Sequence, residues 1–244
     1  MEIFSKNQLQ KNKDDLEIIT IKIDSGIVSL RGLSPKRIRF ELEYALERGS
    51  TDNSFLFTSQ DKAENNTKST ILIHPPGAIY ADVSLPALTS AVSNKNEKLQ
   101  VVVGHVNPNR VGLLKLLKEI YPNLELICSN PGAKLLKELW AQSKTLAKKN
   151  YSQKENNEPP LPTLKVIRNE QELLICHNHK LKLIPAPTPR WPGGLLAFEE
   201  QLGLLMSDKL FAAHICTKNW AESNRSSTEE ERRHFYDSLM SSMD

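Results

Sequence analysis

The chain of 244 residues is long enough for one large domain with a substantial core. Its net charge of +3 is too small to indicate nucleic acid or an anionic membrane as a partner. No apolar run approaches the roughly 20 residues that span a bilayer, and the polar N-terminus lacks the apolar stretch of an export signal. We therefore expect a cytoplasmic protein whose three separated cysteines are reduced.

Residues 1–15 are polar, and we interpret them as a flexible leader before one domain over residues 16–244. Alternating or continuous apolar runs then predict strands. These are Leu16–Ile23, Ile27–Leu33, Ser54–Thr58 and, after a polar turn at Asp61–Ser69, Thr70–His74. The stretch Arg37–Leu46 fits a strand by its alternation and a helix by its Glu, Leu and Ala content, and both readings stay open.

Strands and helices alternate in the middle of the chain. Buried strands are predicted at Leu99–Val103 and Leu124–Cys128, and Cys128 is expected in the core. Helices are predicted at Tyr80–Val92, in the Leu-rich segment after Arg110, and at Ala133–Ala147. This alternation implies a partly parallel sheet covered by helices.

The last third of the sequence predicts mostly strands. Lys148–Pro162 is interpreted as a surface loop. Strands follow at Thr163–Ile167, Leu173–Cys176 and Leu181–Pro185, then a hairpin of Gly194–Phe198 and Leu202–Met206, and a helix at Ser227–Met240 capped by Ser227. Two βα-rich halves with inward-facing strands predict an α/β fold, a four-layer αββα sandwich.

The stretch Val101–Gly112, VVVGHVNPNRVG, joins a buried strand to a helix. In the metallo-β-lactamase superfamily this junction carries the metal-ligand motif His-x-(His/Glu)-x-Asp-His. His105 stands at the first ligand position, but Asn107, Asn109 and Arg110 stand at the others. An arginine has no lone pair to give and repels a cation. The stretch is therefore either a ligand cradle whose ligands are exchanged or an ordinary turn in which Asn and Pro provide the geometry.

Six stretches together resemble one family. They are RFELEYALERGSTDNSFLF, HVNPNRVG, SNPGAK, PAPTPRWPGG, SDKLFAAHIC and EERRHFYDSLM. The chain resembles the N-terminal metallo-β-lactamase-like domain of flavodiiron proteins, and most of all the cyanobacterial diflavin type. That type passes electrons from NAD(P)H to oxygen in photosynthetic cells and makes water. The resemblance covers about four-fifths of the chain, and the motifs are specific as a combination.

The resemblance places the substitutions on the iron-ligand positions. Arg190, in Pro189–Pro192, stands for a ligand His, and Lys209 stands for the bridging Asp, one place after Asp208. His74 stands where the superfamily has an Asp, and the last ligand would lie beyond Asp244. We therefore expect a substituted pocket with neither a catalytic residue nor a metal ligand set. Its residues are His105, Asn107, Asn109, Arg110, Arg190 and Lys209, and a small anion is a possible occupant.

The family's cofactors and partners give further expectations. FMN and FAD belong to flavodoxin-like and flavin reductase-like domains, which are expected to be absent from this chain, and the lactamase-like domain itself is expected to be incomplete at its C-terminal end. The chain alone is then expected to hold no cofactor and to be inactive. Its partner would be a ligand-complete flavodiiron paralogue or a second copy in a head-to-tail dimer. Trp191 is a candidate flavin-facing residue, with a core or surface position as the alternative.

Two other functional hypotheses stay open. The first is a metal-dependent hydrolase with a mononuclear site of His105, Asp208 and His214. The second is a pseudo-enzyme that binds a small anion at Arg110, Arg190 and Lys209. The pair His177 and His179 has metal-ligand spacing, but no carboxylate stands near it in the sequence. We interpret that pair as part of a solvated turn.

Overall fold

The computed structural model describes residues 15–37, 39–40, 43–44, 48–58, 70–142, 158–176, 179–211, 215–219, 229–230, 232–233 and 236. The predicted leader apart from Asp15, the turn at Asp61–Ser69, most of the loop at Lys148–Pro162 and most of the helix at Ser227–Met240 lie outside these residues. No helix in the described part of the chain is long and apolar enough to cross a membrane.

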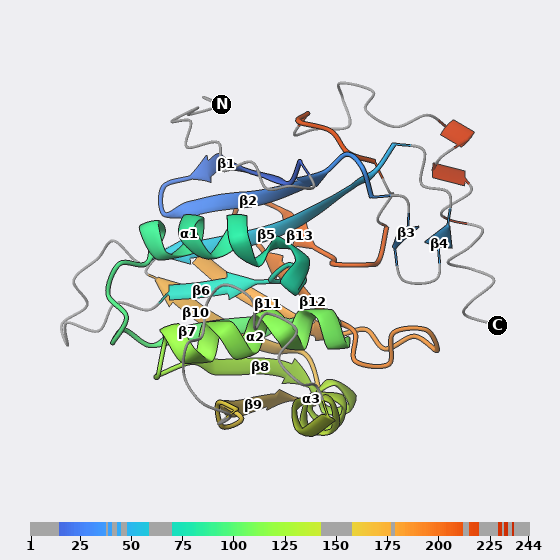
Figure 1. The fold of residues 1–244 in the computed structure, drawn as a ribbon. Helices are drawn as coiled ribbons and strands as arrows, with labels where there is room; N and C mark the ends of the chain where they lie inside the picture. The colour runs from blue at the N-terminus through green and yellow to red at the C-terminus, as the bar shows by residue number, and fades with distance from the viewer. Residues whose placement is uncertain are drawn as a thin grey trace.

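A seven-stranded mixed sheet forms the centre of the molecule (Figure 1). In spatial order its strands are β1 (Glu17–Asp24), β2 (Ile27–Ser34), β5 (Ser50–Thr58), β6 (Thr70–Ile73), β7 (Leu99–Val103), β8 (Glu125–Ser129) and β9 (Thr163–Ile167). The pairs from β1 to β6 are antiparallel, and those from β6 to β9 are parallel. The parallel strands are joined by helical crossovers, as the alternation in the sequence predicts.

Helices cover one face of this sheet (Figure 1). They are the short 3-10 helix η1 (Ala78–Tyr80), α1 (Ala81–Ala91), α2 (Pro108–Ile120) and α3 (Asn130–Gln142). The leucines of α2, among them Leu113, Leu114 and Leu117, pack on Val101 and Val103 of β7 in a large apolar core. Cys128 lies in the same core, as predicted, and burial raises the pKa of its thiol to about 12.

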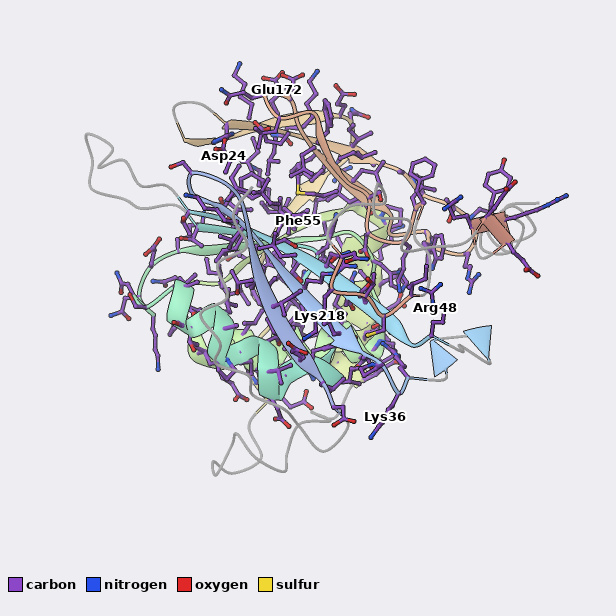
Figure 2. The ribbon with its side chains drawn as sticks, turned by 90° about the horizontal axis from the view of Figure 1, so that it is seen from above. Asp24, Lys36, Arg48, Phe55, Glu172 and Lys218 are labelled. Atoms are coloured by element: carbon purple, nitrogen blue, oxygen red, sulfur yellow. The ribbon has the colours of Figure 1, made fainter. Side chains whose placement is uncertain are left out.

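A second, four-stranded antiparallel sheet packs on the other face. Its strands are β10 (Gln171–Cys176), β11 (His179–Pro185), β12 (Leu195–Glu199) and β13 (Leu204–Met206). Leu181, Leu183 and Ala197 of this sheet meet Ile71 and Val102 of the first in a second core. Figure 2 shows the helices, the large sheet and the small sheet as successive layers, with Phe55 between the sheets. The described residues thus contain three of the four predicted layers: one layer of helices and the two sheets.

Several boundaries differ from those predicted: β10 and β11 begin two residues earlier and β13 two residues later than expected, and the largest differences are in β5 and α3. Strand β5 begins at Ser50, four residues before the predicted Ser54, because the polar residues 50–53 pair in register with β2. Helix α3 begins at Asn130, three residues before the predicted Ala133, because the Ser129 hydroxyl accepts the backbone N–H of Gly132 at 3.1 Å. The ambiguous stretch Arg37–Leu46 contains two short paired strands, β3 (Arg39–Phe40) and β4 (Glu43–Tyr44).

Candidate functional site

The candidate site lies where two parallel strands end. His74 directly follows β6, and His105 follows β7 after the intervening Gly104, so both stand at the same edge of the large sheet. The small sheet is tied to this edge by hydrogen bonds: the Leu195 N–H donates to the Gly104 carbonyl at 3.2 Å, and the Ser129 hydroxyl donates to the Gly193 carbonyl at 2.9 Å. The carboxyl ends of parallel strands are a usual place for ligands in α/β folds.

A buried ion pair between Arg110 and Asp208 occupies this edge. Arg110, in the first turn of α2, is 4% exposed, and its guanidinium donates to Asp208 Oδ2 at 2.5 Å and to Oδ1 at 3.3 Å. The same guanidinium donates to the backbone carbonyl of His105 at 3.0 Å. Burial is the largest single influence and would raise the pKa of Asp208, but the charge and hydrogen bond of Arg110, together with the charges of His74 and Lys209, outweigh it and hold that pKa well below its usual range. The pocket therefore contains a fixed positive charge that belongs to the chain.

His74 also lies beside the Asp208 carboxylate, near the oxygen Oδ2 that Arg110 binds. Its ring is fully buried, and its Nε2–H donates to the Met206 carbonyl at 2.9 Å. This bond leaves Nδ1 as an acceptor without a hydrogen-bond partner, 3.8 Å from Asp208 Oδ2. Burial lowers the pKa of His74, although Asp208 acts in the opposite direction. His74 is thus a neutral imidazole that joins the end of β6 to the end of β13.

The backbone around this cluster leaves no spare room. His74 and Asp208 both have positive φ angles, of 55° and 53°, which side chains other than glycine seldom adopt. A Cβ atom on Gly104 would lie 2.6 Å from His74 Nδ1 and 2.8 Å from Asp208 Oδ2. Glycine is therefore required at position 104, because any larger residue would separate the imidazole from the carboxylate.

A second carboxyl group, that of Asp52 on β5, belongs to the same electrostatic cluster. Burial raises the pKa of Asp52, while the charges of Arg110 and Lys209 lower it. Lys209 also lowers the pKa of Asp208. Lys209 therefore acts on both acids through its field, whereas Arg110 contacts Asp208 directly.

The two asparagines at ligand positions have structural contacts. Asn107 is the N-cap of α2, and its side-chain oxygen accepts the Arg110 N–H at 2.7 Å. The side chain of Asn109 lies against the backbone of Gly77, so closely that a Cβ atom there would clash with its amide. The interpretation of this stretch as a strand-to-helix turn is thus confirmed for Asn107, whose oxygen is used by the helix.

His105, Trp191 and Arg190 form a stack beside the ion pair. The rings of His105 and Trp191 meet edge to face, with centroids 6.4 Å apart, and the Arg190 guanidinium carbon lies 5.2 Å from the Trp191 ring centroid. Trp191 is only 6% exposed, and its indole N–H has no hydrogen-bond partner. Trp191 is therefore a buried residue of the site, and the guanidinium of Arg190 lies over its ring.

A small pocket opens next to this stack. Its lining residues come from the loop after β7, the loop between β11 and β12, the start of β12 and the turn after β13. They are Gly104, Ala186, Thr188, Trp191, Gly194, Leu195, Leu196, Ser207, Asp208, Lys209 and Leu210. A lysine, an ion-paired aspartate and a tryptophan thus line one small space, which suits a small polar molecule better than an extended substrate.

The structure brings together some predicted site residues and not others. His105, Asn107 and Asp208 each contact Arg110, and Trp191 contacts His105 and Arg190. Asn109 faces Gly77, and His214 lies outside the described residues. Asp52 and Gly104 are site residues that were not predicted from the sequence. The strand register reveals Asp52, which lies opposite Gly32 once β5 is known to begin at Ser50.

The interpretation of His179 as part of a solvated turn is wrong. His179 begins β11, is 7% exposed, and its Nδ1 lies 3.0 Å from Glu199 Oε1. Glu199 is fully buried and also accepts the backbone N–H groups of Gln201 and Leu202 at 3.3 and 2.7 Å. The antiparallel pairing of β11 with β12 brings this distant carboxylate to the histidine. His177 lies outside the described residues.

Comparisons with known proteins identify the class. No protein-family model matches the chain. Diflavin flavoprotein A 6 of Nostoc sp. is 36% identical over 231 residues, which are 95% of this chain and 36% of that protein. The crystal structure of a fragment, residues 1–254, of diflavin flavoprotein A 5 of Nostoc sp. matches with a TM-score of 0.73 and 32% identity, over 92% of this chain and 79% of that one.

The metal-soaked Flv1 flavodiiron core of Synechocystis sp. matches with a TM-score of 0.72 and 30% identity, over 92% of this chain and 50% of that one. The two facing sheets, the helical layer and the site at the strand ends thus define a metallo-β-lactamase-like domain of the flavodiiron kind. Within that class, the chain belongs to the diflavin flavoprotein family. It spans about a third of the length of the relatives that it matches, 36% and 34% for two of them.

Proposed function

We propose that this domain is a metal-free, non-catalytic partner subunit in a diflavin flavoprotein assembly that reduces oxygen to water with electrons from NAD(P)H. The observation that carries the proposal is the buried Arg110–Asp208 ion pair at the strand ends. A ligand-complete paralogue would perform the chemistry, and this chain would supply a matching surface. A second copy of the chain is the other candidate partner.

The residues present do not fit a diiron centre. Two iron ions need several anionic oxygen ligands and neutral imidazoles. The corresponding positions carry Asn107, Asn109, Arg110, Arg190 and Lys209. In the described residues no three His, Cys, Asp or Glu side chains come close enough together to hold a metal ion. Asp208 lies at this edge of the sheet, but the negative charge of its carboxylate is already compensated by Arg110.

The charge balance favours the same proposal. A cation beside the guanidinium of Arg110 would be repelled, and separating Arg110 from Asp208 would leave both charges buried without a partner. The chain therefore provides the compensating positive charge from its own side chain. We infer that it folds without iron and that no step of oxygen reduction takes place in this pocket.

The test is metal content per chain, measured by plasma mass spectrometry on protein purified without chelator and offered iron and zinc. Less than about a tenth of an equivalent is expected. A variant that restores the ligands (Asn107→Glu, Asn109→Asp, Arg110→His, Arg190→His, Lys209→Asp) should bind more iron than the wild type. The double variant Arg190→His/Lys209→Asp, which keeps Arg110, is the matched control and should gain less.

Full occupancy of the wild type by iron or zinc would contradict the proposal and favour a metal-dependent hydrolase with a mononuclear site of His105, Asp208 and His214. The partner role has its own test. The chain is mixed with a ligand-complete diflavin flavoprotein, and complex formation and oxygen uptake are measured. A stable complex whose oxygen uptake differs from that of the paralogue alone is expected, and the absence of any complex would contradict the role.

A second candidate function, the binding of a small anion, is supported by the pocket beside Trp191. Lys209 and Trp191 both line it, and the Trp191 indole N–H is a donor without a hydrogen-bond partner. Bromide is a suitable probe because its anomalous scattering locates it in a crystal. A bromide peak near Trp191 that disappears in Lys209→Met would support this function, and an empty pocket at high bromide would contradict it.

A further inference from the structure

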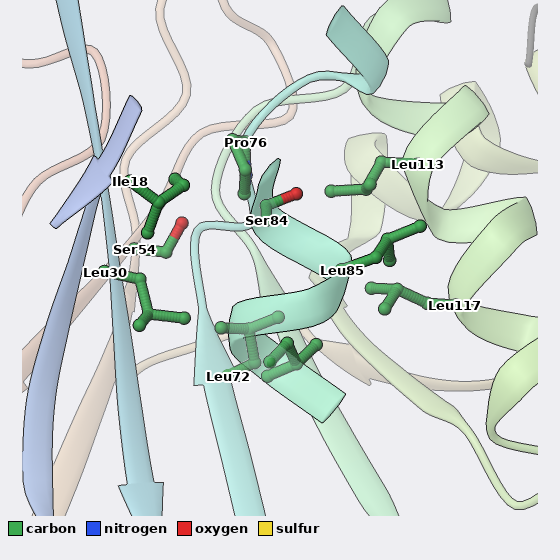
Figure 3. Close-up of a pocket in the computed structure, with 10 residues that line it drawn as sticks. Ile18, Leu30, Ser54, Leu72, Pro76, Ser84, Leu85, Leu113 and Leu117 are labelled. Carbon is green, nitrogen blue, oxygen red and sulfur yellow. The ribbon is translucent and has the colours of Figure 1, made fainter. Parts of the chain in front are cut away.

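Helix α2 carries a fully buried lysine on its outer side. Its leucines Leu113 and Leu117 face α1 and the large sheet (Figure 3). Successive residues of an α-helix are about 100° apart, so Lys115 points about 200° away from Leu113 and lies on the side of the exposed Glu119. The Lys115 side chain is nevertheless 0% exposed. A segment other than the large sheet must therefore cover it.

The contacts of Lys115 identify that segment as residues 158–162, which lead into the edge strand β9 and which we call the strap. Glu158 Oε2 accepts a hydrogen bond from Lys115 Nζ at 2.7 Å. The same Nζ lies 5.7 Å from the ring centroid of Trp140 on α3, and the Trp140 indole N–H donates to the Pro159 carbonyl at 2.9 Å. Leu161 packs against the core beneath the helices. The strap is thus attached to both α2 and α3.

Strand β9 has few buried side chains of its own. Of its five residues only Ile167 is buried, whereas four of the five residues of β8 are buried. β9 pairs with β8 along its whole length and so covers the outer backbone edge of that strand. A bare edge of an apolar strand can pair with another chain. Attachments outside β9 are therefore needed to hold it in place.

We propose that the strap and the Lys115–Glu158 pair form a conformational device that holds β9 on the large sheet. Closing the strap removes the Lys115 ammonium from water, and the Glu158 carboxylate and the Trp140 ring offset that cost. Without the carboxylate, the ammonium regains water when the strap lifts, and β9 then leaves β8. The proposal does not depend on the partner role, since no residue of the substituted pocket takes part.

Hydrogen exchange of the full chain, followed by mass spectrometry, measures the pairing of β9. In Glu158→Ala, the amides of residues 164–167 are expected to exchange about tenfold faster or more than in the wild type, while those of β7 keep their rate. The double variant Glu158→Ala/Lys115→Met removes the charge that needs a partner and should restore the wild-type rate. Glu172→Ala is the matched control and should leave β9 unchanged, because Glu172 is exposed and its partner Lys180 lies 3.9 Å away.

Three results would overturn the proposal. An unchanged rate in Glu158→Ala would mean that the pair does not hold β9. An equal acceleration in β7 and β9 would mean that Glu158 supports the whole fold and not the strap. A double variant that exchanges as fast as Glu158→Ala would mean that the buried charge of Lys115 is not the cause. If Glu158→Ala does not fold, Glu158→Gln, which keeps an acceptor oxygen, gives the same comparison with a smaller acceleration.

Discussion

Arg110 and Asp208 compensate each other inside the pocket, so the removal of either one leaves an unpaired buried charge. Arg110→Ala is expected to lower the free energy of unfolding by about 3–5 kcal/mol. Arg190→Ala should cost far less, about 1 kcal/mol, because that guanidinium is partly exposed and stacks on Trp191. Urea denaturation of both variants measures the difference.

The double variant Arg110→Met/Asp208→Leu replaces both charged side chains of the ion pair with apolar ones. It should be more stable than Arg110→Ala, since it leaves no unpaired charge behind. Equal losses in Arg110→Ala and Arg190→Ala would mean that the Arg110–Asp208 pair contributes no more than a surface contact does.

The titration of His74 and Asp208 gives the protein a pH-dependent stability. Burial lowers the pKa of His74 below its ordinary 6.5, so the unfolded chain takes up this proton at higher pH than the folded chain. Despite burial, Arg110 holds the pKa of Asp208 below its ordinary 3.8. Both groups therefore stabilise the fold at neutral pH, and this stability is lost as the pH falls, first below 6.5 through His74 and then below 3.8 through Asp208.

Asp52 acts in the opposite direction, since its raised pKa favours the protonated form in the folded chain and offsets part of the loss near pH 4. Urea denaturation between pH 2 and 8 measures the sum, and His74→Gln should flatten the curve near pH 6. A curve for His74→Gln that falls as steeply as that of the wild type would contradict the assignment to His74.

At the scale of elements, the first turn of α2 depends on Asn107. Its side-chain oxygen accepts the Arg110 N–H, so Asn107→Ala should lower the free energy of unfolding by about 1 kcal/mol. Asn107→Asp keeps an acceptor at the cap and should stay close to the wild type. Thermal unfolding followed by circular dichroism measures both, and an unaffected Asn107→Ala would show that the cap is not needed.

Elements with continuous apolar runs could be predicted from the sequence, because burial on both faces dictates their composition. Strands β6, β7, β8 and β9 agree with the prediction to within one residue at each end. Residues 50–53 of β5 were not predicted as a strand, since Ser, Thr, Asp and Asn are typical of loops. Only their pairing with β2 makes them a strand. Local propensity says nothing about such long-range pairing.

The candidate site was predictable in position but not in contacts. The motif around His105 located the strand end and Arg110, whereas the partner of Arg110 comes from a turn nearly a hundred residues later. The burial of His179 could not be predicted for the same reason: its partner is distant in the sequence. The register of the β11–β12 hairpin brings the carboxylate of Glu199 to the His179 ring. Asn107 also shows that a side chain at a predicted ligand position can instead accept a hydrogen bond from the nearby helix backbone.

At the scale of the whole molecule, the large sheet belongs to two cores at once. Leu113 packs on its helix-covered face, and Leu183 packs on the face against the small sheet. We expect Leu113→Ala and Leu183→Ala each to cost about 2–5 kcal/mol and to lower one shared unfolding transition. Calorimetry together with near-ultraviolet circular dichroism measures this. Two resolved transitions, each affected by one variant, would mean that the layers unfold separately.

The guanidinium in the pocket is covalently part of the polypeptide, whereas a metal ion must be supplied and can be removed. A charge that is encoded in the gene has no dissociation constant, needs no loading step after synthesis and is not extracted by EDTA. The melting temperature of this domain should accordingly be the same with and without a chelator. If the domain holds no iron, as proposed, a cell short of iron would make it in the same folded form as a cell with plenty.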